Sequence, residues 1–128
     1  MITTLRKRLR REETGFTLIE LLVVVIILGI LTAIAVPSYL SFRGRAQSSA
    51  NKANVRSIIP SIEAYYSDNN TYSSMTLALL KAGYDQALNV SNYTLASLSD
   101  TGYCVQSGTG GQVWSYTPGA GFANAACT

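Results

Sequence analysis

The chain has 128 residues, of which 48% are hydrophobic and only 13% charged, and it contains no histidine. This length suffices for one small domain rather than two. Without histidine, without a phosphate-binding glycine loop and without a Cys-x-x-Cys pair, the sequence offers no catalytic constellation, and its outward carboxylates are too scattered to form an acid–base pair. We therefore expect no enzyme, no catalytic residue, no cofactor and no bound metal. The scattered carboxylates are Glu63, Asp68, Asp85 and Asp100.

Residues 1–15 form a polar, basic leader. Five basic and two acidic residues precede Gly15, and they account for the whole net charge of +3. A basic cluster can indicate a nucleic-acid partner, but this one adjoins an apolar run. We interpret it as the positive-inside signal that keeps an N-terminus cytoplasmic, and we expect no specific nucleic-acid contact. The cluster comprises Arg6, Lys7, Arg8, Arg10 and Arg11, with Glu12 and Glu13.

The apolar run covers residues 16–36 and contains a single charge, Glu20. As a helix it would extend about 32 Å, close to the hydrocarbon thickness of a bilayer. We therefore expect residues 16–36 to span a membrane. A secretory signal peptide cut after Ala35 is an alternative, but its apolar region would be longer than usual and would include Glu20. A plain single-pass membrane anchor is another alternative, although it leaves the charged residue Glu20 unexplained.

Beyond Pro37 the sequence predicts an amphipathic helix, because apolar residues recur at steps of three and four. We expect one long helix over residues 16–66, kinked at Pro37 and Pro60, each of which lacks a backbone donor. Two or three separate helices are the alternative. The apolar positions are Tyr39, Phe42, Ala46, Ala50, Ala53, Val55, Ile58, Ile59, Ile62, Tyr65 and Tyr66.

Residues 67–128 predict a small α+β head. The polar stretch 67–74 should end the long helix, and Thr76 can cap a short helix that ends near Gly83. Strand-like segments follow around residues 88–98, 103–105 and 113–116, with a glycine-rich hairpin loop at 108–111. The expected fold is thus a long N-terminal helix, apolar in its first half and amphipathic in its second, packed on a small antiparallel sheet.

Two features of the head concern its stability. Cys104 and Cys127 are both predicted to lie outside the cytoplasm, and their even number and wide spacing favour one disulfide over a metal site. The aromatic residues of the head could form a ligand-stacking surface, but we expect them to fill the interface between helix and sheet. They are Tyr65, Tyr66, Tyr72, Tyr93, Tyr103, Trp114 and Tyr116.

Residues 13–37, ETGFTLIELLVVVIILGILTAIAVP, resemble the N-terminus of type IV prepilins and type II secretion pseudopilins. The resemblance implies that a prepilin peptidase cuts between Gly15 and Phe16 and that the new amino group of Phe16 is methylated. It also implies that Glu20 acts in filament assembly. Elementary chemistry agrees, since a carboxylate in an apolar helix needs a partner, and the Phe16 amine of a neighbouring subunit would supply one.

The function expected from this resemblance is that of a pilin, a structural subunit of a bacterial type IV pilus for adhesion, motility or DNA uptake. Its partners would be copies of itself, the prepilin peptidase, an inner-membrane assembly platform and, before assembly, membrane lipid. The precursor would cross the inner membrane once and later join a filament on the cell surface. A type II secretion pseudopilin is the first alternative. A membrane-anchored or secreted binding domain that does not polymerise is the second.

Overall fold

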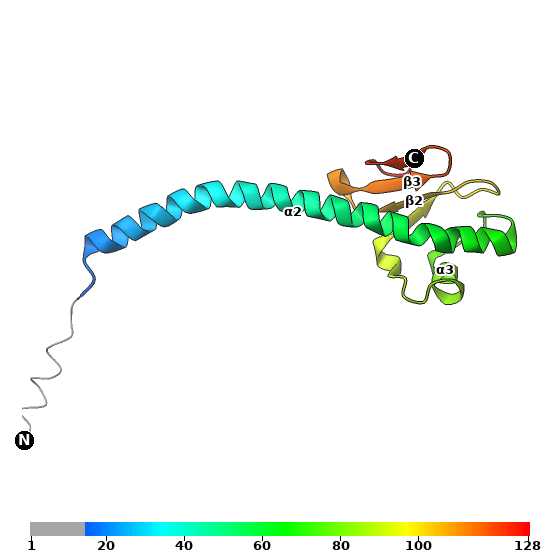
Figure 1. Ribbon diagram of the computed structural model, residues 1–128, viewed down its shortest axis with the longest axis horizontal. Helices are drawn as coiled ribbons and strands as arrows, with labels where there is room; N and C mark the ends of the chain where they lie inside the picture. The colour runs from blue at the N-terminus through cyan, green and yellow to red at the C-terminus, as the bar shows by residue number, and fades with distance from the viewer. Residues whose placement is uncertain (1–14) are drawn as a thin grey trace, which may run out of the picture. The chain divides into compact units, whose positions relative to one another are not determined.

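The computed structural model describes residues 15–128, so the predicted basic leader before Gly15 lies outside the described residues. The chain divides into two compact units, one ending at Tyr39 and the other running from Leu40 to Thr128. Helix α2 (Leu18–Asn69) belongs to both units, and helix α3 (Leu77–Gly83) to the second (Figure 1). The second unit also holds two 3-10 turns and four strands. These are η1 (Val90–Asn92), β1 (Thr94–Ala96), β2 (Cys104–Ser107), η2 (Gly110–Gln112), β3 (Trp114–Thr117) and β4 (Gly121–Ala123).

Helix α2 is a single helix of 52 residues, which confirms the prediction of one long helix and excludes separate ones. It includes both Pro37 and Pro60, because a proline removes only one backbone donor from a helix that is otherwise bonded throughout. The kinks expected at the two prolines stay predictions.

The end of α2 lies a little beyond the predicted residue 66. The Asn69 side chain donates through Nδ2 to the Tyr65 carbonyl at 2.9 Å and so satisfies a carbonyl of the last turn. Asn70 then takes a left-handed conformation with φ of 55°, and its N–H donates to the Tyr66 carbonyl at 2.7 Å. Asparagine is one of the few residues that adopt this conformation readily, so the helix ends there.

The second part of α2 presents a buried stripe to the head. Val55, Ile58, Ile62 and Tyr65 follow one another at steps of three and four residues, and each is at most 6% exposed. They pack against residues of the head, and burial of each such aliphatic side chain contributes roughly 1.5–3 kcal/mol. The stripe begins later than expected, because the apolar positions before Val55 are exposed. The partners in the head are Tyr72, Met75, Leu80, Leu88, Tyr103 and Val105.

The sheet is an antiparallel meander in the order β1-β2-β3-β4. Leu95 lies opposite Val105, Val105 opposite Tyr116, and Tyr116 opposite Phe122, which forms a row of side chains across all four strands. Val105 is fully buried, and the other three side chains pack against the same core. Cross-strand pairs of this kind stabilise the sheet and fix its register.

Two sequence expectations for the strands need correction. The strand-like segment at 88–98 contributes only the three residues of β1, because Asn89 accepts from the Ser91 N–H at 3.3 Å and starts the 3-10 turn η1. Strand β4 was not predicted. The short helix is confirmed with its cap, since the Thr76 hydroxyl oxygen accepts from the Leu79 N–H at 3.2 Å.

The disulfide between Cys104 and Cys127 is present, as predicted. It joins the segment after β4 to the start of β2. The Cys127 N–H also donates to the side-chain oxygen of Gln106 at 2.6 Å, and the Ser97 hydroxyl donates to the carbonyl of Thr128 at 2.8 Å. The last residues of the chain are therefore attached to β2 at two points and to the residue after β1 at a third.

Candidate functional site

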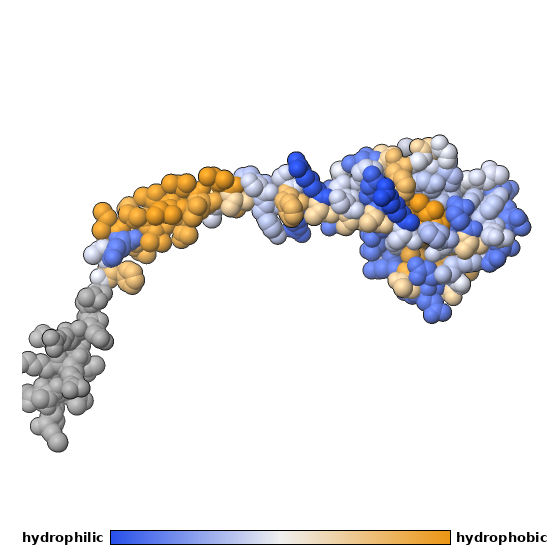
Figure 2. Space-filling view, in the orientation of Figure 1, coloured by the Kyte–Doolittle hydropathy of each residue, from blue (hydrophilic) through white to orange (hydrophobic). Residues whose placement is uncertain are grey.

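The first part of α2 exposes a continuous apolar surface. Every residue from 15 to 43 is exposed, including the aliphatic residues of the predicted membrane segment. Figure 2 shows apolar side chains, in orange, over the visible face of this part of the helix. Among residues 15–128, α2 is the one helix long and apolar enough to cross a membrane. An apolar surface of this size has to be covered by lipid or by other protein chains.

Glu20 is the only charged residue in the apolar segment of residues 16–36, and it takes part in a local capping box. The Thr17 hydroxyl oxygen accepts from the Glu20 N–H at 3.3 Å, while Glu20 Oε2 accepts from the Thr17 N–H at 3.0 Å and from its hydroxyl at 2.9 Å. These bonds satisfy backbone donors at the start of the helix. They also explain why α2 begins at Leu18, two residues after the expected start at Phe16.

Sequence reasoning singled out Glu20 but missed Thr17. The signal was present, because Thr17 and Glu20 have the spacing of a capping box immediately before an apolar run. All of the side-chain bonds to Glu20 reach Oε2, and Oε1 can accept from a further donor. The geometry thus provides a carboxylate oriented by its own helix start, with one oxygen for a partner.

Gly15 and Phe16 are exposed and precede the helix outside any regular secondary structure, and the Phe16 side chain is 91% exposed. A Cβ built on Gly15 would meet nothing within 4 Å. The fold therefore places no demand for glycine at this position. Any demand for it comes from a second molecule that contacts the backbone here.

In the second unit, Glu63 connects α2 to the head. Its two carboxylate oxygens accept from the hydroxyls of Tyr103 at 2.9 Å and Tyr72 at 3.1 Å. Burial, followed by the hydrogen bond to Glu63 and its charge, raises the pKa of Tyr72 to about 12. The same causes in the same order raise the pKa of Tyr103. Both tyrosines therefore stay neutral and keep donating to Glu63 throughout the physiological pH range.

Aromatic rings fill the interface between α2 and the sheet, as predicted. Tyr103 is 1% exposed, its ring centroid lies 4.8 Å from that of Tyr72, and Tyr72 in turn stacks on Tyr66 at 4.4 Å. Trp114 donates from its ring N–H to the Ser48 hydroxyl at 2.8 Å. These contacts assign the aromatic residues mainly to the core. Within residues 15–128, no three His, Cys, Asp or Glu side chains form a group that could hold a metal ion.

The arrangement described so far defines a class of protein. A small disulfide-closed head is fixed on the second part of a long helix, and the first part of that helix is apolar, exposed and interrupted by one carboxylate. A chain of this class has an exposed apolar helix that lipid or other protein chains have to cover, and a folded head with its own core.

Comparison with known proteins identifies the family. Residues 10–36 match the family profile described as the prokaryotic N-terminal methylation motif. The chain is 37% identical to the type IV wide pilus major component PilA4 of Thermus thermophilus, over 81% of this chain and 80% of that protein. It therefore belongs to the type IV pilin family, whose members are structural proteins rather than enzymes.

Two further relatives match over about half of this chain. The type IV major pilin protein PilA of Myxococcus xanthus is 39% identical over 52% of this chain and 30% of that pilin. The type II secretion system core protein G of Pseudomonas aeruginosa is 43% identical over 51% of this chain and 46% of that protein. The chain thus spans less than half the length of these two relatives, and the similarity to both pilins and secretion pseudopilins agrees with the resemblance noted in the sequence.

Proposed function

We propose that the chain is the precursor of a type IV pilus subunit that polymerises through α2 into a surface filament for adhesion, motility or DNA uptake. The observation that carries this proposal is the exposed apolar surface of α2 with Glu20 as its only charge. Lipid can cover that surface in a single subunit, and the helices of neighbouring subunits can cover it in a filament. The similarity to a wide-pilus component over most of both chains supports the pilus.

Maturation removes residues 1–15. A prepilin peptidase cuts between Gly15 and Phe16, and the new amino group of Phe16 is methylated. The match to an N-terminal methylation motif supports this step. The exposure of Gly15 and Phe16 supports it as well, because a membrane peptidase needs access to the backbone. Since the fold leaves room for a side chain at Gly15, the peptidase is the component that requires glycine there.

Before assembly the precursor crosses the inner membrane once, with its N-terminus in the cytoplasm. The basic leader and the neutral remainder of the chain support this orientation, since positive charge is retained on the cytoplasmic side. The head then lies outside the cytoplasm, where the disulfide between Cys104 and Cys127 persists. An inner-membrane platform moves subunits from lipid into the filament.

In the filament, Glu20 pairs with the Phe16 amine of an adjoining subunit. The helices leave lipid and pack together, so an unpaired carboxylate would lose its solvation. The capping box keeps Glu20 Oε2 on its own Thr17, and Oε1 accepts from the neighbour's amine. This pairing offsets the desolvation of both charges and also fixes the axial register between subunits.

The experiment replaces Glu20 by valine in cells that lack any wild-type copy. We expect cleavage after Gly15 and membrane insertion to continue, while filaments fall at least tenfold, because the Phe16 amine of each subunit has lost its partner. Blotting measures cleaved subunit, N-terminal sequencing checks that it starts at methylated Phe16, and electron microscopy counts filaments in the same cells. Glu20→Asp is the matched control, because it keeps the negative charge on a side chain that is one methylene group shorter. Normal filament numbers with Glu20→Val would refute the assigned role.

A type II secretion pseudopilin is the second candidate, and the similarity to core protein G of a type II secretion system is the observation in its favour. A strain that lacks this chain separates the two. Loss of surface pili with normal export of folded proteins supports the pilus, whereas loss of export with normal pili supports the pseudopilus. A binding domain that never polymerises would affect neither.

A further inference from the structure

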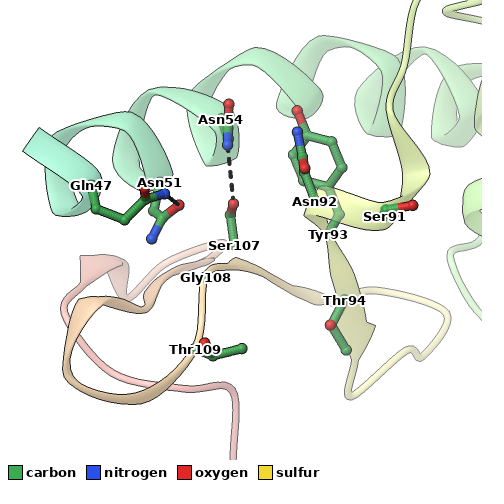
Figure 3. Close-up of a pocket in the computed structure, with 10 residues that line it drawn as sticks. All are labelled: Gln47, Asn51, Asn54, Ser91, Asn92, Tyr93, Thr94, Ser107, Gly108 and Thr109. Atoms are coloured by element: carbon green, nitrogen blue, oxygen red, sulfur yellow. Dashed lines mark hydrogen bonds between the residues drawn. The ribbon is translucent and has the colours of Figure 1, made fainter.

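The second unit contains a cavity of about 380 Å³ between α2 and the chain that follows η1 and β2. Figure 3 shows Asn51 and Asn54 on α2 directed toward the chain at Ser107 and Gly108, with the hydrogen bond from Asn54 to Ser107 dashed. Amide and hydroxyl groups dominate the lining, which contains one aromatic ring, that of Tyr93. Its volume lies in the range of pockets that hold small ligands, roughly 300–1,000 Å³.

One wall of the cavity is held in place by Asn51, a buried polar residue of α2 that lies one turn before the buried stripe and is only 4% exposed. Its Nδ2 donates to the Gln112 carbonyl at 2.6 Å, and its Oδ1 accepts from Gln47 Nε2 at 3.1 Å. Gly108 passes so close, with φ of +93°, that a Cβ there would collide with the Asn51 amide. The loop after β2 is therefore fixed against the helix, and the cavity is preorganised.

The remaining polar groups of the lining keep hydrogen-bonding capacity that these contacts do not use. Asn54 donates through Nδ2 to the Ser107 hydroxyl at 3.3 Å, and its Oδ1 can accept from a ligand. Asn92 and Thr94 are exposed at the rim and add an amide and a hydroxyl. Tyr93 is partly buried, and its hydroxyl shares a hydrogen bond with Ser57 at 3.1 Å, which fixes the ring.

This lining selects the class of ligand. The ten lining residues include no charged side chain, so a phosphate, a carboxylate or a metal ion would find no counter-charge. They include no aliphatic side chain, so a lipid or an apolar peptide side chain would gain little. A ligand that is neutral and rich in hydroxyl groups matches amides that both donate and accept, beside one aromatic ring. We propose that the cavity binds a neutral sugar residue of a glycan.

Repetition of the site would make weak binding effective. A single uncharged site of this size is open to water and binds weakly, but a filament presents one copy on each subunit. Several copies that engage one polysaccharide raise the apparent affinity by roughly two to four orders of magnitude. The avidity rests on the proposed filament, whereas the binding site itself goes beyond the proposed assembly through residues 16–36 of α2 and is formed by residues of the second unit.

The test measures binding of maltose, cellobiose, lactose and N,N′-diacetylchitobiose to sheared filaments by saturation-transfer-difference NMR. Two variants alter the rim without removing an internal side-chain bond, Asn92→Ala and Thr94→Val, and Asn124→Ala changes an exposed asparagine outside the cavity. We expect at least one disaccharide to bind, both rim variants to weaken binding about tenfold, and Asn124→Ala to leave it unchanged.

Three results would overturn the proposal. The first is that none of the disaccharides binds, and the second is that the rim variants bind them as well as the native protein does. The third is that a neutral peptide binds instead of a sugar and that its binding is weakened by Asn92→Ala and Thr94→Val. Filaments counted by electron microscopy should be as numerous in both variants as in the native strain. If the native chain forms no filaments, the detergent-solubilised full chain takes their place, so that failure of assembly is distinguished from failure of sugar binding.

Discussion

At the scale of the residue, two carboxylates on α2 have different surroundings and different consequences. Glu20 bonds only to Thr17 among the described residues and stands in an exposed apolar segment. Glu63 accepts from two tyrosine hydroxyls that belong to the core of the second unit. The first carboxylate is therefore prepared for a partner outside the chain, whereas the second has its partners inside it and stabilises the head.

The tyrosines bound to Glu63 predict a loss of stability at alkaline pH. In the unfolded chain a tyrosine ionises near pH 10, whereas in the fold Tyr72 keeps its proton up to about pH 12 and the pKa of Tyr103 is also raised. The contribution of these two tyrosines to stability is thus constant below about pH 9 and falls as the pH rises, because the unfolded state then binds fewer protons. We expect the Tm of the detergent-solubilised chain, followed by circular dichroism, to drop by several degrees between about pH 9 and pH 11.

Variants assign this effect to the residues named. Tyr103→Phe should lower Tm at neutral pH and reduce the alkaline decrease, since one of the raised groups is gone. Tyr39→Phe is the matched control, because Tyr39 is exposed outside the second unit, and it should change neither value. An alkaline decrease that is the same with and without the Tyr103 hydroxyl would contradict the assignment.

At the scale of the element, local signals in the sequence predicted most of the helices and strands, but not strand β4. The long helix, the Thr76 cap and strands β2 and β3 each depend on residues within a few positions of one another. Strand β4 contains only Gly121, Phe122 and Ala123, and it exists because β3 supplies a partner in register. No pattern of β-branched residues marks it, so periodicity could not find it.

The candidate sites also differ in whether their residues are close together or far apart in the sequence. Gly15, Phe16 and Glu20 lie within one short motif and were identified from the sequence. The Glu63 connection and the cavity were not, because their members are far apart in the chain. Tyr103 is 40 residues from Glu63, and the carbonyl bonded by Asn51 is 61 residues away. Such pairs depend on the packing of α2 on the sheet, which a reading of neighbouring residues does not determine.

The disulfide joins the segment after β4 to the start of β2. It connects residues 23 positions apart, and a loop of about this length contributes roughly 3 kcal/mol by restricting the unfolded chain. That is a large share of the stability of so small a head. We expect Cys104→Ser or Cys127→Ser to lower the free energy of unfolding by about this amount in urea titrations, and to lower filament yield as well.

The double variant is the control for that prediction. The double variant, Cys104→Ser with Cys127→Ser, should have the same free energy of unfolding as each single variant, because all of them lack the same bond. Reduced wild-type protein should have that free energy of unfolding too. Two thiols that titrate in folded, unreduced protein would show that the bridge does not form in the cell.

At the scale of the whole molecule, the chain combines two units that differ in the surroundings they require. The unit that ends at Tyr39 exposes aliphatic side chains and cannot remain alone in water. The unit from Leu40 onward has its own core, its own sheet and a disulfide. In the proposed pilus subunit, the first unit would provide attachment to lipid or to other subunits, and the second would provide the folded head.

This division predicts that removal of residues 1–38 yields a soluble, monomeric head. The fragment keeps the buried stripe of α2 from Val55 onward and every contact of Glu63, while it loses the apolar segment. Size-exclusion chromatography with light scattering should give one subunit, whereas the full chain should require detergent. Leu40 and Phe42 remain exposed in the fragment, so a version with both changed to serine serves as the control against reversible clustering. Membrane association of the fragment that persists in this control would mean that the membrane segment extends past residue 38.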